Sequence, residues 1–347
     1  MIVGTAGFSW SGSSAISDYL KEFDDFQIYN KVEFLLAYFP DGLEDLDFHL
    51  NKSCSKFLSS CTAIPRFRKV ANYLLGIVTK GKIKRITNDY LNEIIQVKWR
   101  GWGQGQDLLH NLFIYRNLGI RINDRLMQYL PSKFCKKIKL YPIREMEFSI
   151  KPENFYEITQ RYTDNIFKCL GLDLSKNIVL DQAFAGTDPA KSLPYYRNSK
   201  AILVDRDPRD LYVLAKKYFS KRSYPIPFEN VEDFVNYYYH MHKDVLLNSS
   251  KKDVLYIRFE DLVYNYEKTT KRIKTFLEIE QESKNQKKYF DPLKSMINTQ
   301  LFKKHSDLLD DIKYIENKLS DFLFPFEKYD YCPTGDRVFN VPNYSNE

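Results

Sequence analysis

The chain has 347 residues, of which 44% are hydrophobic and 28% charged, a composition that excludes disordered, collagen-like and small disulfide-knotted proteins. The 52 Lys and Arg residues outnumber the 45 Asp and Glu residues, and the net charge of +7 suits an anionic ligand without requiring nucleic acid. The 26 Tyr and 25 Phe residues indicate a bulky core first, and a stacking surface for sugars or other rings second.

The cysteine usage and the apolar runs bear on the compartment. Five Cys residues occur without a CxxC spacing or a neighbouring His pair, which predicts neither a zinc site nor a disulfide framework and favours a reducing compartment. Residues 1–7 have no basic n-region, and the longest apolar runs, such as residues 34–39, are far shorter than the roughly 18 residues of a membrane helix. We therefore expect a cytoplasmic protein without a membrane span.

Residues 1–42 predict the start of an α/β fold. A short apolar strand over residues 1–6 is followed by a glycine-bearing turn and by helical spacing of apolar residues over 12–23. A second strand is predicted over residues 26–36, and the turn residues 40–42 end it.

The segment from His49 to Asn88 is strongly basic. It contains no acidic residue and nine cationic ones, namely Lys52, Lys56, Arg66, Arg68, Lys69, Lys80, Lys82, Lys84 and Arg85. A solvated helical face is the first interpretation of this run, and an electropositive wall near an anionic substrate is the second. The only glycine-dense loop, residues 101–105, lies in a long, mostly helical stretch that we expect to reach Leu170.

Three short apolar segments in the second half of the chain are typical of buried parallel strands, namely residues 177–181, 201–205 and 254–258. Asp207 and Pro208 follow the second segment as a helix N-cap and a first helical residue. Helices are also predicted from residue 260 and over 269–277.

Strands that alternate with helices predict an α/β protein with a parallel, doubly wound sheet and flanking helices. We expect a single domain over residues 1–347, in which residues of about 50–170 form a large helical insertion.

The glycine–serine loop, residues 7–14, is the first candidate site. It fits the pattern G-x-x-x-x-G-x-[ST], in which backbone N–H groups between a strand and a helix can surround an anion. A nucleoside-triphosphate loop needs Lys after the second Gly, and this chain has Ser13 there, so the loop suits phosphate or sulfate better than γ-phosphoryl transfer. A serine-rich helix cap without a ligand is the alternative.

The second candidate is Arg206, which directly follows the strand predicted over residues 201–205. Ligands bind at that edge of a parallel sheet, and an Arg there can bind phosphate through two hydrogen bonds. A surface capping network of Asp207, Arg209 and Asp210 is the alternative interpretation.

Three segments together, residues 7–14, 204–210 and 254–262, resemble the sulfotransferases that use 3′-phosphoadenosine 5′-phosphosulfate (PAPS), and the bacterial ones most closely. The resemblance implies an α/β fold related to the P-loop nucleotide kinases, PAPS as the sulfuryl donor, a hydroxyl acceptor and no metal. It extends to about residue 280, and residues 50–170, which would cap the acceptor side, match nothing.

The resemblance also implies which residues bind the donor. The 5′-phosphosulfate would lie against the first loop, which maps to Ser9, Trp10, Ser11, Gly12, Ser13 and Ser14. Arg206 would bind the 3′-phosphate, and Ser295 and Asn298 correspond to a segment that folds over the nucleotide.

Two positions depart from the family pattern. The usual Ser eight residues after the Arg is Leu214, and the usual cation before the Ser-Gly pair is Trp10. Loop N–H groups, Ser hydroxyls or a cation such as Arg66 or Arg68 would then stabilise the transition state.

The acceptor hydroxyl needs a general base. Glycan-modifying members of the family have a Glu at the end of the second strand, which corresponds to Glu33. An unpaired acidic residue within an apolar strand costs stability, which favours a functional role for Glu33. His49 is the rival. Asp181 could orient an acceptor, although we favour a turn cap.

The sequence thus predicts PAPS-dependent sulfation of a hydroxyl, with a carbohydrate as the first choice of acceptor and a sterol or other lipid alcohol as the second. A non-catalytic nucleotide-binding module and a small-molecule kinase are the alternatives, and nucleic acid is not expected as a partner.

Overall fold

The computed structural model describes residues 1–53, 55–101, 144–219, 226–248, 251–280, 283, 286–334 and 338, together with Ile122, Arg125 and Tyr129. The chain divides into two compact units, of which the first combines Met1–Leu35 with Leu172–Glu347 and the second comprises Leu36–Gly171. The second unit starts earlier than the predicted insertion of about 50–170. That the chain acts as one domain stays a prediction.

A parallel sheet of five strands forms the centre of the first unit. The strand order is β2-β5-β1-β6-β7, and every neighbouring pair is parallel. The strands are β1 (Ile2–Gly7), β2 (Phe26–Tyr29), β5 (Asn177–Ala185), β6 (Ser199–Asp205) and β7 (Val254–Arg258). The prediction of an α/β fold with a parallel sheet is confirmed, and β1 lies in the middle, so the loop that follows it is at the crevice where such sheets bind ligands.

Two strands differ from the prediction. The strand expected over residues 26–36 ends at Tyr29, so Glu33 follows the strand and is not within it. The strand expected over residues 177–181 continues to Ala185 through an irregularity at Gln182, whose φ is +50°. Asp181 therefore lies inside β5, and the prediction that it caps a turn is wrong.

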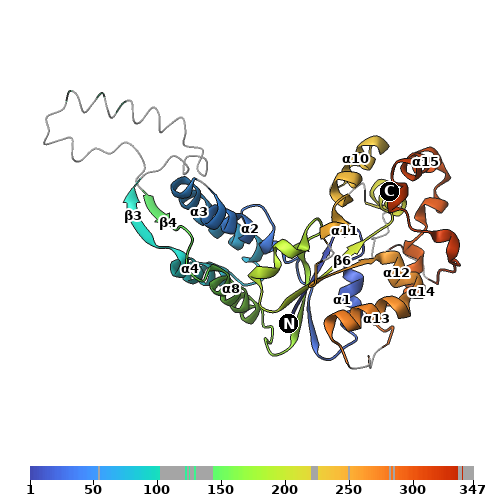
Figure 1. Cartoon of the computed structure of the whole chain (residues 1–347), viewed down its shortest axis with the longest axis horizontal. Coiled ribbons are helices and arrows are strands. Elements are labelled where there is room, and N and C mark those ends of the chain that lie inside the picture. Colours follow the sequence, from blue (N-terminus) through green and yellow to red (C-terminus); the bar gives the residue numbers. More distant parts are fainter. Residues whose placement is uncertain are drawn as a thin grey trace. The chain divides into compact units, whose positions relative to one another are not determined.

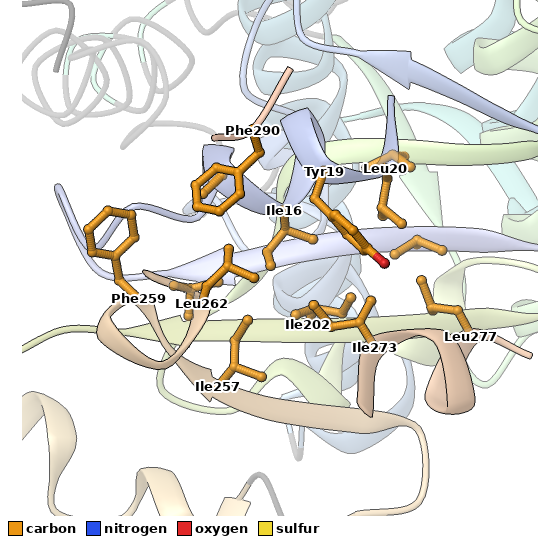
Figure 2. Close-up of a cluster of buried hydrophobic side chains, with 14 of the residues drawn as sticks. Ile16, Tyr19, Leu20, Ile202, Ile257, Phe259, Leu262, Ile273, Leu277 and Phe290 are labelled. Carbon is orange, nitrogen blue, oxygen red and sulfur yellow. The ribbon is translucent and has the colours of Figure 1, made fainter. Parts of the chain in front are cut away.

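One hydrophobic core joins a face of the sheet to the helices α1 (Ser14–Leu20), α12 (Phe259–Tyr264) and α13 (Tyr266–Leu277). Figure 2 shows Ile16 and Leu20 of α1 beside Ile202 of the sheet and Ile273 of α13. The α1 residues on this face follow the helical spacing of the sequence, which is why the short helix packs onto the strands.

A second hydrophobic core involves the helices α9 (Pro208–Val213), α10 (Val231–His242) and α15 (Leu309–Lys318). Figure 1 shows α10 and α15 near one another. The side chain of Asp207 accepts a hydrogen bond from the Arg209 N–H and caps α9, as the sequence predicts. The short helices α11 (Val245–Asn248) and α14 (Pro292–Ser295) complete the described helices of this unit.

The second unit consists mainly of helices: α2 (Leu43–Asp47), a π-helical turn (Phe48–Lys52), α3 (Lys56–Leu75), α4 (Ile83–Ile94) and α8 (Phe155–Cys169). Inside it, the rings of Tyr90 and Tyr162 stack at 4.4 Å, and their hydroxyl groups form hydrogen bonds with Thr159 and Thr87.

The stretch expected to be mostly helical up to Leu170 also contains two antiparallel strands, β3 (Val97–Gly101) and β4 (Arg144–Phe148), which corrects the prediction there. Gly101 ends β3, and the rest of the glycine-dense loop lies outside the described residues. None of the helices in the described ranges is both long and apolar enough to cross a bilayer.

Gly4 is required in β1 because a Cβ there would lie 2.0 Å from Cε2 of Phe184. We expect Gly4→Ala to lower the free energy of unfolding by about 1–3 kcal/mol through overpacking, measured by urea denaturation. Adding Phe184→Leu should recover part of the loss, because the smaller side chain makes room. An unchanged urea midpoint in Gly4→Ala would contradict this packing.

Candidate active site

A cavity of about 330 Å³ lies in the first unit, beyond the carboxyl end of β1. Its lining residues are Trp10, Ser11, Gly12, Ser13, Ser14, Glu33, Asp181, Gln182 and Phe219. Five of the six loop residues predicted to bind the donor therefore meet Glu33, the predicted base, in one cavity. Among the residues that the structure describes, no Lys or Arg lines the cavity.

The glycine–serine loop is shaped by its own hydrogen bonds. The Ser11 N–H donates to the Phe8 carbonyl at 2.9 Å, and the Ser11 hydroxyl accepts from the Phe8 N–H at 3.2 Å. Gly12 has a φ of +88°, and a Cβ there would lie 2.6 Å from the Phe259 ring, so both the backbone conformation and the available space require glycine.

Several backbone N–H groups of this loop have no hydrogen-bond acceptor among the described residues. In the described part of the chain, the N–H groups of Gly12, Ser13 and Ser14 donate to no acceptor. Consecutive N–H groups at the wall of a cavity favour a bound anion, and the hydroxyls of Ser13 and Ser14 add two further polar groups.

Arg206 lies behind the loop. It is fully buried, one guanidinium nitrogen donates to the Trp10 carbonyl at 3.1 Å, and another donates to the Asn298 carbonyl. Its guanidinium carbon lies 5.0 Å from the centre of the Phe259 ring, the ring that also packs against Gly12. Arg206 therefore contacts the backbone of the loop but is not among the residues that line the cavity.

Buried acidic residues surround this arginine. Asp210 accepts hydrogen bonds from the N–H groups of Gln300 and Leu301, and Glu260 accepts one from the Asp207 N–H. Burial raises the pKa of Glu260 to about 7, although the positive charges of Arg258 and Arg206 act against the shift. The alternative interpretation was a surface capping network of Asp207, Arg209 and Asp210. Asp207 does cap α9, but all three residues are buried.

Two carboxyl groups face the cavity. Burial and the neighbouring charge of Asp181 raise the pKa of Glu33, and burial raises the pKa of Asp181. Asp181 accepts a hydrogen bond from the Thr5 hydroxyl at 3.0 Å, and the Phe34 N–H donates to the Asp181 carbonyl at 2.8 Å. This backbone contact holds the segment that carries Glu33 against β5.

The remaining lining residues form one polar and one apolar part. The Gln182 amide donates to the Ser13 hydroxyl at 2.8 Å and so connects β5 with the loop. On the apolar part, the Trp10 ring stacks on Phe219 at 4.6 Å, with 11° between the ring planes. Trp10 has a φ of +61° and stands at the sequence position where the resemblance leads one to expect a cation.

Other predicted donor residues do not line the cavity. Ser9 precedes Trp10 but is absent from the lining, Ser295 ends α14, and Asn298 is buried with its carbonyl turned to Arg206. Leu214 is fully buried in the core with α9 and α10.

The second unit holds the remaining candidates. His49 lies in the π-helical turn and is not among the lining residues. Arg66 pairs with Asp41 at 2.7 Å, and the guanidinium of Arg68 donates two hydrogen bonds to Glu147, so both proposed cations are engaged within their own unit.

Gln182 and Phe219 are lining residues that the sequence analysis missed. Gln182 carried a signal, since it directly follows an apolar strand and an acidic residue. Phe219 carried none, because its place depends on packing against Trp10. In the described ranges no group of three or more His, Cys, Asp or Glu side chains could hold a metal ion, and the absence of a metal stays a prediction.

No family model and no curated protein matches the chain. Among solved structures it is similar to the sulfotransferase domain of the olefin synthase of Synechococcus PCC 7002, with 14% identity, a TM-score of 0.38, and coverage of 84% of this chain and 76% of that domain. It is also similar to a sulfotransferase domain from the curacin biosynthetic pathway, with 14% identity, a TM-score of 0.38, and coverage of 92% of this chain and 97% of that one.

The contacts of Arg206 predict a structural role in the unliganded protein. Arg206→Ala should lower the free energy of unfolding by about 3–5 kcal/mol, because the buried carboxyl groups around it lose their positive partner. Urea denaturation without ligand measures this. Arg272→Ala is the matched control, since this exposed side chain makes one bond to the Tyr256 carbonyl and should change stability by about 0.5 kcal/mol or less. Equal stabilities of the two variants would exclude the structural role.

Proposed function

We propose that the protein is a sulfotransferase that moves the sulfuryl group of PAPS to a hydroxyl group of an acceptor. The observation that carries this proposal is the shared cavity: the glycine–serine loop and Glu33, to which the resemblance assigns the donor and the base, line it together. The loop follows β1 and Glu33 follows β2, so two separate elements contribute to one cavity. The alternative, a serine-rich helix cap that binds no ligand, does not explain why the Glu33 carboxyl group and the loop line the same cavity.

The 5′-phosphosulfate of the donor would bind through backbone dipoles and hydroxyl groups. Its 5′-phosphosulfate would accept hydrogen bonds from the N–H groups of Gly12, Ser13 and Ser14 and from the two Ser hydroxyls. Because the described lining contains no Lys or Arg, the same groups would stabilise the charge that develops on the bridging oxygen as the sulfuryl group leaves.

On the acceptor side, Glu33 would act as the general base. The acceptor oxygen attacks the sulfur in line, and its proton passes to the Glu33 carboxylate. The bond between sulfur and the bridging oxygen breaks and releases 3′-phosphoadenosine 5′-phosphate, which is also called 3′,5′-ADP. The raised pKa of Glu33 makes its carboxylate a stronger base than an ordinary glutamate.

For the 3′-phosphate, the proposed neighbours are Arg206, Ser295 and Asn298. Arg206 would reach a phosphate only if it released the carbonyl of Trp10 or of Asn298. Donor binding would then break a hydrogen bond that connects the glycine–serine loop or the Asn298 segment to Arg206.

The proposed acceptor is a carbohydrate hydroxyl. The stacked rings of Trp10 and Phe219 offer an apolar surface beside the carboxyl groups of Glu33 and Asp181, a combination that suits a sugar with one apolar face. A sterol or other lipid alcohol would use the same rings and remains the alternative acceptor.

A non-catalytic nucleotide-binding protein is the second candidate, and it is favoured by Trp10, which stands at the position where the resemblance leads one to expect a cation. Replacing Trp10 with Lys distinguishes the two functions. Sulfuryl transfer that is absent from the wild type and present in Trp10→Lys indicates the non-catalytic protein, whereas activity in the wild type indicates the enzyme.

The first test is a thermal-shift titration of the whole chain with 3′,5′-ADP, compared with ATP plus Mg²⁺. We expect stabilisation by 3′,5′-ADP alone, because a ligand that binds only the folded state raises the melting temperature by mass action. Stabilisation by ATP plus Mg²⁺ alone would indicate a kinase.

Ser14→Asp should abolish the 3′,5′-ADP shift, since it adds a negative charge at the anion site, and the exposed Ser320→Asp should leave the shift unchanged. A Ser14→Asp variant that keeps the shift would remove the loop from the donor site.

The role of Glu33 is tested by Glu33→Gln, which keeps the size of the side chain and removes the base. Once an acceptor is known, we expect kcat to fall by about 10²–10⁴-fold, with the 3′,5′-ADP shift retained. An equal loss of activity in His49→Gln, with Glu33→Gln fully active, would transfer the role to His49.

The pH dependence follows from the raised pKa of Glu33. A base acts when deprotonated, so log kcat/KM should fall by about one per pH unit on the acid side, with a midpoint above the ordinary value of 4.5. Glu33→Gln should lose this acid limb. A wild-type profile that stays flat down to pH 4.5 would contradict the assignment.

A further inference from the structure

The connection between α3 and α4 exposes apolar side chains. Ile77 is 91% exposed, the largest value for any large apolar side chain in the part of the chain that the structure describes, and Tyr73 is 75% exposed. Tyr73 lies in the last turn of α3, and Ile77 lies two residues beyond its end. We call residues 73–85 the α3–α4 tip.

The backbone of the tip is well supported, so this exposure does not come from a frayed helix end. The Thr79 side chain is buried; its hydroxyl donates to the Leu75 carbonyl at 2.7 Å and accepts from the Ile83 N–H at 3.3 Å. The Gly81 N–H donates to the Gly76 carbonyl at 2.8 Å, and the Gly81 φ of +78° turns the chain into α4. Leu75, Thr79 and Ile83 face the interior, which leaves Ile77 directed to solvent.

Cations surround these apolar residues. Lys80, Lys82, Lys84 and Arg85 are all exposed. Arg85 lies 3.8 Å from Asp89, whereas the three Lys side chains form no ion pair with any described residue. The wider segment, residues 49–88, contains nine cationic residues and no acidic one, so this part of the sequence carries a net positive charge.

We propose that the α3–α4 tip binds the surface of an anionic lipid bilayer, with Ile77 and Tyr73 entering the interface and the Lys side chains at the headgroups. An exposed aliphatic side chain gains from an apolar phase, an exposed Tyr suits the boundary between headgroups and acyl chains, and cations attract anionic lipids. A nucleic acid would satisfy the cations but would offer nothing to Ile77. The proposal depends only on the second unit and is independent of the proposed sulfotransferase activity.

The experiment is flotation of the full chain with vesicles of phosphatidylcholine, with and without phosphatidylglycerol. We expect binding to the mixed vesicles only, weakened by salt because the attraction is partly electrostatic. The triple variant Lys80→Gln, Lys82→Gln, Lys84→Gln should bind about a hundredfold more weakly, at roughly fivefold per cation. Ile77→Asp should weaken binding about tenfold or more.

Matched controls distinguish a specific effect of the α3–α4 tip from an effect of net charge or of any exposed apolar residue. Lys243→Gln, Lys268→Gln, Lys271→Gln changes the net charge by the same amount at exposed sites in the first unit, and Leu309→Asp alters another exposed apolar residue. Both controls should bind like the wild type. Failure of the wild type to bind mixed vesicles, or binding unaffected by Ile77→Asp, overturns the proposal. Binding of duplex DNA that needs the Lys residues, together with vesicle binding that does not need Ile77, would identify a nucleic-acid surface instead.

Discussion

The guanidinium of Arg206 connects two backbone segments that are far apart in the chain. It donates to the carbonyls of Trp10 and Asn298, and so joins the glycine–serine loop to the segment after α14. An arginine can do this where a lysine cannot, because its planar group has several donors in fixed directions. The position of the loop, and with it the shape of the cavity, depends on this buried cation and on the Phe259 ring that packs against both Arg206 and Gly12.

The charge distribution of the first unit is unusual for a proposed anion site. Arg206, which donates a hydrogen bond to the loop, is fully buried, while the described lining of the cavity consists of hydroxyls, N–H groups, an amide, two carboxyl groups and two aromatic rings. Burial raises the pKa of both carboxyl groups. Backbone dipoles then act over a short distance in a partly desolvated cavity, where their effect is larger than in water.

Local sequence patterns predicted the elements that depend on local chemistry. The apolar run before Gly7, the glycine–serine spacing and the Asp-Pro helix start all predicted the correct elements. Glu33 was predicted as the base from the resemblance and from its acidic side chain within an expected apolar strand, and the second argument is wrong because Glu33 follows β2. The burial of Arg206 and the stacking of Phe219 on Trp10 could not be read from the sequence, because they arise from contacts between distant segments.

The irregularity at Gln182 changes the length of β5 without changing its faces. Between the pairs Gly4–Leu180 and Ala6–Phe184, β1 advances by two residues and β5 by four. Because side chains alternate with a period of two, an even excess leaves Leu180 and Phe184 on one side, whereas an odd excess would send Phe184 to the opposite side. The two surplus residues thus allow Asp181 and Gln182 to line the cavity while the alternation of the strand, and with it the packing of Leu180 and Phe184, is preserved.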